Sequence, residues 1–162
     1  LSLGIVGNIC APMLVPIARA EDASLRMPEN CLVNVRVIKG SRRTEDTARR
    51  ELNSGAYLTD VKSQLEAIPF SSFRVVDSAE KKVKLGETGD FTLVDSGNVH
   101  NLSIKPCTVS GERIRLSVDW SGPAGEPLLS TKLGVIRGKT VVVGEDSTND
   151  SSTIMCIRVD CS

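Results

Sequence analysis

The sequence predicts an α+β fold that is mainly β: an antiparallel β-sandwich or open barrel with one amphipathic helix packed on it. After residue 69, short runs of alternating apolar and polar residues recur between turn residues, a pattern typical of antiparallel sheets with one buried face. Before residue 69, one stretch instead repeats its apolar residues at helical spacing. Aromatic residues make up only 3% of the chain, so we expect an aliphatic core.

The first segment, residues 1–20, is expected to be a secretory signal peptide. Leu1 to Ile17 is apolar with small interruptions, and Ala18-Arg19-Ala20 provides the small residues of a cleavage site. No charged region precedes the apolar run, so we expect the sequence to begin inside the signal. The alternative is an N-terminal membrane anchor, but an asparagine and two prolines interrupt a run that would need about 20 apolar residues.

Residues 21–30 are expected to be a flexible lead-in, and residues 31–162 to form a single mostly-β domain. The 20 basic and 20 acidic side chains balance, which argues against nucleic acid and anionic lipid as partners. No later stretch reaches a membrane-spanning length. We therefore expect a periplasmic or secreted protein with a protein partner in the cell envelope, no nucleic-acid partner and no stable membrane span. The oligomeric state does not follow from the sequence.

The cysteines predict disulfide bonds. Removal of the signal would remove Cys10 from the five cysteines, and the even number left in an exported chain suggests two disulfides. Cys31 and Cys161 lie in phase with the apolar residues of the first and last expected strands, and could meet if these strands are antiparallel. We therefore favour Cys31–Cys161 and Cys107–Cys156. The alternative is that some remain free as small buried apolar residues.

Elements before residue 69 include one strand and one helix. The strand is expected at Leu32–Ile38, and the charged segment Ser41–Asn53 is expected to contain a solvated helical turn. The helix follows, with Thr59 or Asp60 capping its first amides and Pro69 ending it. Its apolar stripe consists of Leu58, Val61, Leu65 and Ile68.

Everything after Pro69 is expected to be β-structure. The clearest strand, residues 112–120, alternates strictly between apolar and polar side chains. Glycine, serine and asparagine clusters separate it from its neighbours. The expected strands are Phe70–Val76, Lys82–Leu85, Phe91–Val94, Val99–Lys105, Glu112–Trp120, Leu128–Ile136, Thr140–Val143 and Thr153–Asp160.

The single histidine, His100, is the first residue to consider for catalysis. It lies in phase with Leu102 and Ile104, which would turn it towards the core or the mouth of the sheet. A catalytic histidine also needs a nucleophile and an orienting acid, and no Gly-x-Ser-x-Gly elbow is present. We therefore favour a structural role, and we expect no catalytic residue.

Pairs of carboxylates flank two expected turns. Asp77 with Glu80, and Glu87 with Asp90, lie in polar segments, where solvated carboxylates are the default. The acidic loop at residues 145–150 could bind calcium weakly, but it lacks the spacing of a calcium loop. These groups do not predict a glycosidase or a specific metal site.

The segment Gly134–Thr140 ends in Gly-Lys-Thr but is one residue too short for a phosphate loop. We expect it to be the turn of a β-hairpin at Arg137-Gly138. Zinc is not expected either, because no C-x-x-C pair is present. We therefore expect no cofactor, no metal and no enzymatic activity.

Residues 128–144 resemble a hairpin of secretins, the outer-membrane channels of bacterial secretion and pilus systems. The pattern there is a strand, a D/R-G-x-T turn and then V-V-I-G-G. The rest of a secretin is not seen, so we do not expect this chain to form a channel. The order of elements from Pro69 to Gly144 is similar to that of small exported envelope proteins of Gram-negative bacteria, including deltaproteobacteria. This resemblance implies a location and a fold, and assigns no functional residues.

Together these features predict a non-catalytic exported envelope domain that binds a protein partner in a secretion, pilus or adhesion assembly. An exposed sheet edge is the surface most available for such a partner. The alternative is a periplasmic hydrolase that uses turn carboxylates, or a domain that binds a carbohydrate or small ligand.

Overall fold

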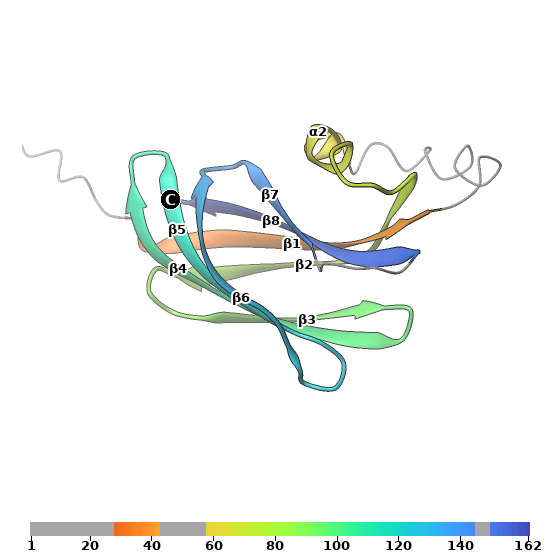
Figure 1. Ribbon diagram of the computed structural model, residues 1–162. Helices are drawn as coiled ribbons and strands as arrows, with labels where there is room; N and C mark the ends of the chain where they lie inside the picture. The colour runs from red at the N-terminus through yellow and green to blue at the C-terminus, as the bar shows by residue number, and fades with distance from the viewer. Residues whose placement is uncertain (1–27, 43–57, 145–149) are drawn as a thin grey trace, which may run out of the picture.

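The computed structural model describes residues 28–42, 58–144 and 150–162. In this part of the chain, eight strands form two four-stranded antiparallel sheets that pack face to face (Figure 1), which confirms the mainly-β class. The expected signal peptide and the charged helical turn lie outside the described residues. The strands are β1 (Asn30–Ser41), β2 (Ser72–Lys84), β3 (Gly89–Asp95), β4 (Asn98–Ser110), β5 (Arg113–Ser121), β6 (Pro127–Ile136), β7 (Thr140–Gly144) and β8 (Ser151–Cys161).

The strand order places four strands at sheet edges. The first sheet has the order β2-β1-β8-β7, and the second has the order β3-β4-β5-β6. The chain passes between sheets twice, from β2 to β3 and from β6 to β7. The sandwich therefore has one side bordered by β2 and β3 and an opposite side bordered by β6 and β7.

The core lies between the two sheets and follows the alternation seen in the sequence. On β5 every second side chain is buried, as the pattern of this strand predicts. The valines of β1 at positions 33, 35 and 37 face these residues from the first sheet in the same apolar cluster. The buried side chains of β5 are Ile114, Leu116, Val118 and Trp120.

The predicted turn between Phe70–Val76 and Lys82–Leu85 is wrong, because most of both runs belongs to the single strand β2, which continues between them. This strand pairs with the whole length of β1, so long-range backbone pairing overrides the polar composition of its middle. A register shift absorbs one extra residue: Val37 lies opposite Asp77, whereas Ile38 lies opposite Val75. β1 also begins at Asn30, within the segment expected to be a flexible lead-in.

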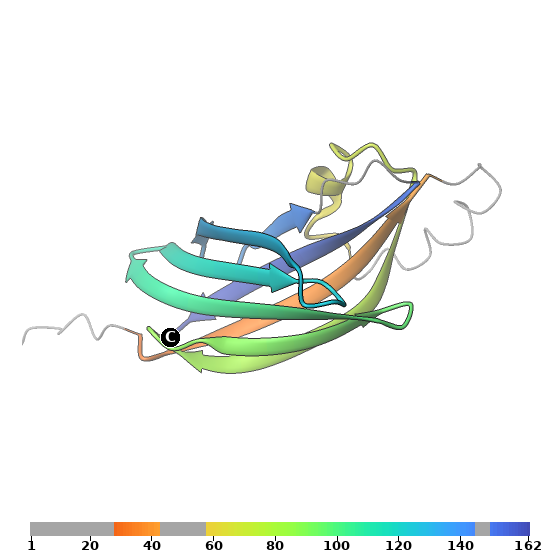
Figure 2. The same cartoon turned by 60° about the horizontal axis from the view of Figure 1, so that its bottom comes forward.

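The predicted amphipathic helix is also wrong, since within residues 58–69 only the single turn α2 (Lys62–Leu65) is helical. Val61 is at the N-cap position and no side chain caps the turn, because Asp60 instead accepts hydrogen bonds from Arg36 and Thr140. The apolar residues still pack on the first sheet. Figures 1 and 2 place this region on the sheet face that points away from the second sheet. It covers Ile38, Ile154 and Cys156 there.

The Arg137-Gly138 turn exists, but it does not form the predicted hairpin. Gly138 adopts a φ of 68°, as a tight turn requires. The strands it joins then separate, because β6 pairs only with β5 and β7 only with β8 among the described residues. Figure 1 shows the two ribbons leaving this turn in different directions. The segment is a crossover between sheets, so the hairpin that supports the resemblance to secretins is not formed.

Candidate binding site at the β6–β7 side

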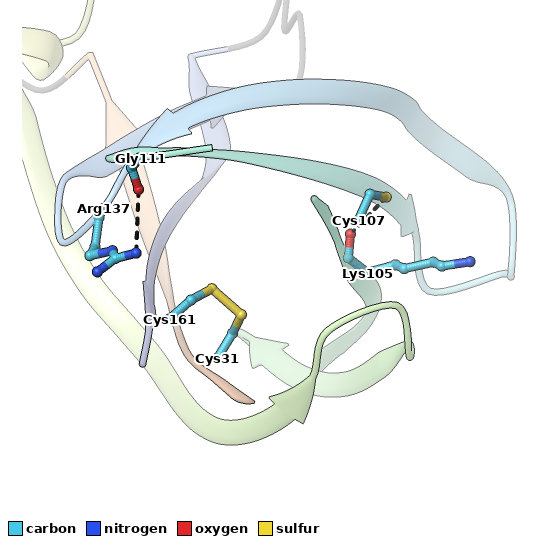
Figure 3. The surroundings of a disulfide bond; sticks show 6 residues. All are labelled: Cys31, Lys105, Cys107, Gly111, Arg137 and Cys161. Atoms are coloured by element: carbon cyan, nitrogen blue, oxygen red, sulfur yellow. Dashed lines mark hydrogen bonds between the residues drawn. A yellow bond between two sulfur atoms is a disulfide. The ribbon is translucent and has the colours of Figure 1, made fainter. Parts of the chain in front are cut away.

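The first predicted disulfide is confirmed. Cys31 and Cys161 lie directly opposite each other on β1 and β8, and their sulfur atoms are bonded at 2.03 Å (Figure 3). The bond ties two central strands whose cysteines are separated by 130 positions in the sequence. The matching phase of the two cysteines in the sequence was the signal that identified this pair.

The second predicted disulfide, Cys107–Cys156, is not formed, and both residues are free thiols. Cys156 faces the outer side of the first sheet, where it packs beneath the α2 region. Cys107 lies on β4 of the second sheet, donates to the carbonyl of Lys105 at 3.4 Å, and points away from the Cys31–Cys161 bond in Figure 3. Burial raises the pKa of Cys156 to about 12, so this thiol stays protonated at neutral pH.

His100 is buried, as its phase predicts. Its Nδ1 accepts a hydrogen bond of 3.2 Å from the indole N–H of Trp120, and the two rings lie 5.8 Å apart between their centres. Because that nitrogen accepts, it does not bear the imidazole proton. This bond gives the buried indole N–H of Trp120, the largest core side chain, an acceptor. That is a structural role for His100.

Three of the paired carboxylates lie in strands of the structure. Asp77 and Glu80 lie within β2 rather than beside a turn, and Asp90 accepts a hydrogen bond from Ser103 on β4. Within the described ranges, no group of three or more His, Cys, Asp or Glu side chains is placed to hold a metal ion. The same ranges contain no helix long and apolar enough to cross a membrane.

A buried carboxylate that the sequence analysis missed joins the sheets near the β3–β4 turn. Asp95 is only 1% exposed and accepts hydrogen bonds of 2.9 Å from both Lys39 of β1 and Thr153 of β8. Burial by itself raises the pKa of Asp95, but these hydrogen bonds and the Lys39 charge outweigh it and lower the pKa below its usual value. Its position in a polar turn concealed it, because such residues are usually solvated.

A hollow of about 500 Å³ opens on the outer face of the first sheet. Two pairs of its lining residues are hydrogen-bonded to each other: Arg36 donates to both carboxylate oxygens of Asp60, and Asn34 donates to Glu80 at 3.3 Å. The hydrogen bonds and the Arg36 charge lower the pKa of Asp60 although burial opposes them. The lining residues are Leu32, Asn34, Arg36, Thr59, Asp60, Glu80, Arg158 and Asp160.

The side bordered by β2 and β3, here called the closed side, is joined by side chains that reach across it. Asp77 of β2 accepts the backbone N–H of Val94 of β3 at 2.8 Å. Lys81 donates to the carbonyl of Asp90 at 2.5 Å. The strands also approach so closely that a Cβ on Gly89 would overlap a methyl of Val83. The outer backbone edge of β3 is therefore partly occupied.

The opposite side, bordered by β6 and β7, is here called the open side. Among the described residues, no hydrogen bond joins strand β6 to strand β7. Leu129 and Leu133 of β6 and Val141 and Val143 of β7 face the core but are only partly buried. The open side thus combines a long edge strand with apolar side chains that are incompletely covered.

Comparison with known protein families gives no match, and comparison with curated protein sequences gives none either. Among solved structures, the type II secretion system secretin XcpQ from Pseudomonas aeruginosa, determined by cryo-EM, is similar over 86% of this chain and 60% of its own length. The TM-score is 0.45 and the sequence identity is 9%. The match therefore spans less than two thirds of the secretin chain, and a similarity this weak assigns no function.

Proposed function

We propose that this chain is an exported, non-catalytic binding domain that receives an extended segment of a protein partner along β6. The observation that supports this proposal is that Leu129 and Leu133, which face the core from β6, are only partly buried. An added strand bonds the free backbone edge and covers the side chains that face the core. The partner segment should alternate apolar with polar residues, because only one of its faces would meet the core.

The choice of β6 over the other edges follows from what occupies them. β7 has only five residues, and Gln64 already donates to the carbonyl of its first residue, Thr140. β2 is protected by three exposed lysines at positions 81, 82 and 84, which discourage pairing at an edge strand. β3 is capped by the side chains of β2. β6 has ten residues and one lysine, Lys132.

Export is supported by the Cys31–Cys161 disulfide, because disulfides persist mainly in oxidising compartments. A periplasmic or secreted location fits this bond and the apolar segment at residues 1–20. A domain of this kind suits an envelope assembly, where strand addition between subunits is a recurrent mode of association.

The experiment that tests the proposal uses the full chain with its disulfide and a short synthetic peptide that alternates leucine and valine with serine and threonine. We expect the peptide to slow amide hydrogen exchange in residues 127–136, because these amides would gain bonds. The control peptide has the same sequence with N-methyl groups on alternate amides, which prevents strand pairing and keeps the side chains. Protection at β2 or β3, or no protection of β6 in a chain that is monomeric at the concentration used, would contradict the proposal.

A further inference from the structure

We infer that β6 pairs with β6 of a second copy of this chain. The two strands run antiparallel about a two-fold axis at Thr131. This inference rests on the proposed function, because it uses the same edge. β6 itself meets the requirement stated above: Leu129, Thr131, Leu133 and Val135 face inward, opposite the inward row of β5, while Ser130 and Lys132 face outward. The result is an isologous dimer with a continuous eight-stranded sheet.

The inner face of such a pair is apolar on both copies. Directly opposed residues of antiparallel strands point to the same face, so the axis must pass through a residue. With the axis at Thr131, Leu129 of one copy lies opposite the partner's Leu133, and the same contact occurs twice. Both leucines are only partly buried in the single chain, and the pairing covers them with each other.

The outer face of the pair is complementary in charge. Lys132 is exposed and makes no ion pair with the described residues. The same axis places it opposite the partner's Ser130. In each chain the Ser130 hydroxyl donates to Asp119 of β5 at 2.5 Å. Lys132 then lies two strands from the partner's Asp119, about 10 Å between backbones, which the two side chains can span.

Neighbouring registers lose these contacts. An axis at Lys132 would oppose two lysines, which is destabilising. An axis at Ser130 would place Lys132 opposite the partner's Leu128, at the point where β6 shifts register against β5. An axis at Leu133 would place Leu129 opposite the partner's Arg137, beyond the end of the strand. Thr131 is also close to the middle of β6, so the paired stretch is longest there.

The register can be tested by symmetric cross-linking. Thr131→Cys, made in a Cys107→Ser background to remove the half-buried free thiol, should form a disulfide-linked dimer under mild oxidation. Gly134→Cys is the matched control: it is exposed on the same strand, and a side chain there meets nothing within 4 Å. In the proposed dimer, position 134 of one copy would lie several residues from position 134 of the other. This variant should therefore stay monomeric on a non-reducing gel. Equal cross-linking of both variants would overturn the register.

The association can be tested without cysteines by sedimentation velocity on the full chain. We expect a concentration-dependent dimer, and Lys132→Asp should raise its dissociation constant by about tenfold, since two symmetric contacts change from attraction to repulsion. Lys132→Asp combined with Asp119→Lys should restore association. Lys105→Asp is the matched control, because Lys105 is exposed on the same sheet but on β4, away from the edge.

A chain that stays monomeric at high concentration and does not cross-link at position 131 would overturn the dimer. That result leaves the peptide experiment to decide the proposed function: a monomer whose β6 amides are protected by the peptide accepts a strand from another protein. A monomer that neither dimerises nor protects β6 contradicts both proposals.

Discussion

The closed and open sides of the sandwich differ in how their edge strands are bonded within the chain. Both are bordered by one edge strand from each sheet. On the closed side, Asp77 and Lys81 bond the backbone of β3, and Asp95 ties the end of β3 to Lys39 of the first sheet at 2.9 Å. On the open side, the part of the chain that the structure describes makes no such bond between the two strands.

This difference shows that an edge strand can be protected from within its own chain or left unpaired, among the described residues. Closure needs polar side chains that reach across and a backbone that approaches closely, as at Gly89. Among residues 58–144 and 150–162, no side chain bonds β6 to β7, and a Cβ on Gly134 would meet nothing within 4 Å. We interpret the open side as a surface for association rather than as a defect, because unprotected edges otherwise promote aggregation.

The largest expected effect concerns the buried end of the closed side. Asp95→Ala should lower the free energy of unfolding by about 3 kcal/mol, because it leaves Lys39 without its buried partner. Urea denaturation measures this loss. Asp119→Ala is the control variant, made near the open side, because Asp119 is exposed and accepts a hydrogen bond from Ser130. Equal losses from both variants would mean that Asp95 does not secure the closed side.

The two edge glycines provide a matched comparison. Gly89→Val should cost about 2 kcal/mol, because the new Cβ would overlap Val83 and force β2 and β3 apart. Gly134→Val should change stability by less than about 0.5 kcal/mol, since no atom lies within 4 Å of its new Cβ. Thermal unfolding at low protein concentration, where association is absent, measures both. A large loss at position 134 would show that β6 is already covered.

A smaller effect is expected from the Asp77 bond to the Val94 amide. Asp77→Ala should cost about 1 kcal/mol and should speed exchange of that amide, because its acceptor is lost. Lys132→Ala on β6 is the control and should leave β3 amides unchanged. Hydrogen exchange resolved by residue distinguishes the two. Unchanged exchange at Val94 in the Asp77 variant would mean that another group closes this edge.

The smallest expected effect is the pH dependence of the closed side. The pKa of Asp95 is lowered in the folded chain, so the unfolded chain binds its proton first and the carboxylate contributes stability above the unfolded pKa. That contribution should be lost as pH falls below about 4, towards the folded pKa. Asp95→Asn should therefore lose less stability than the natural chain between about pH 5 and pH 3. Parallel losses would exclude Asp95 as the source.

Much of the fold could be predicted because alternation is a local property. The inward row of β5 and the phase of Cys31 and Cys161 followed from counting residues along single strands. The predictions that proved wrong concerned contacts between segments that are distant in the sequence. Cys156 was expected to pair with Cys107, but its face of β8 is buried by the α2 region, whose packing no local pattern reveals.

In the candidate site, too, local patterns were predicted and long-range contacts were not. The sequence predicted that an exposed sheet edge would bind a partner, but it did not predict which strands lie at the edges, because strand order is set by long-range pairing. Residues 128–144 predicted a hairpin, and the structure instead sends β6 and β7 to different sheets. Asp95 was hidden for the same reason: its partners, Lys39 and Thr153, are distant in sequence.

The sequence by itself determined which residues of each strand face the core, because that follows from the two-residue period of β-structure. It also favoured the Cys31–Cys161 pairing, through the phase of the two cysteines, and determined the even balance of charge. Only the tertiary structure decided that the helical stripe of residues 58–68 forms a single turn, that β2 is one strand, and that one side is closed and the other open. Those outcomes depend on which strands become neighbours, and contacts between distant segments establish that.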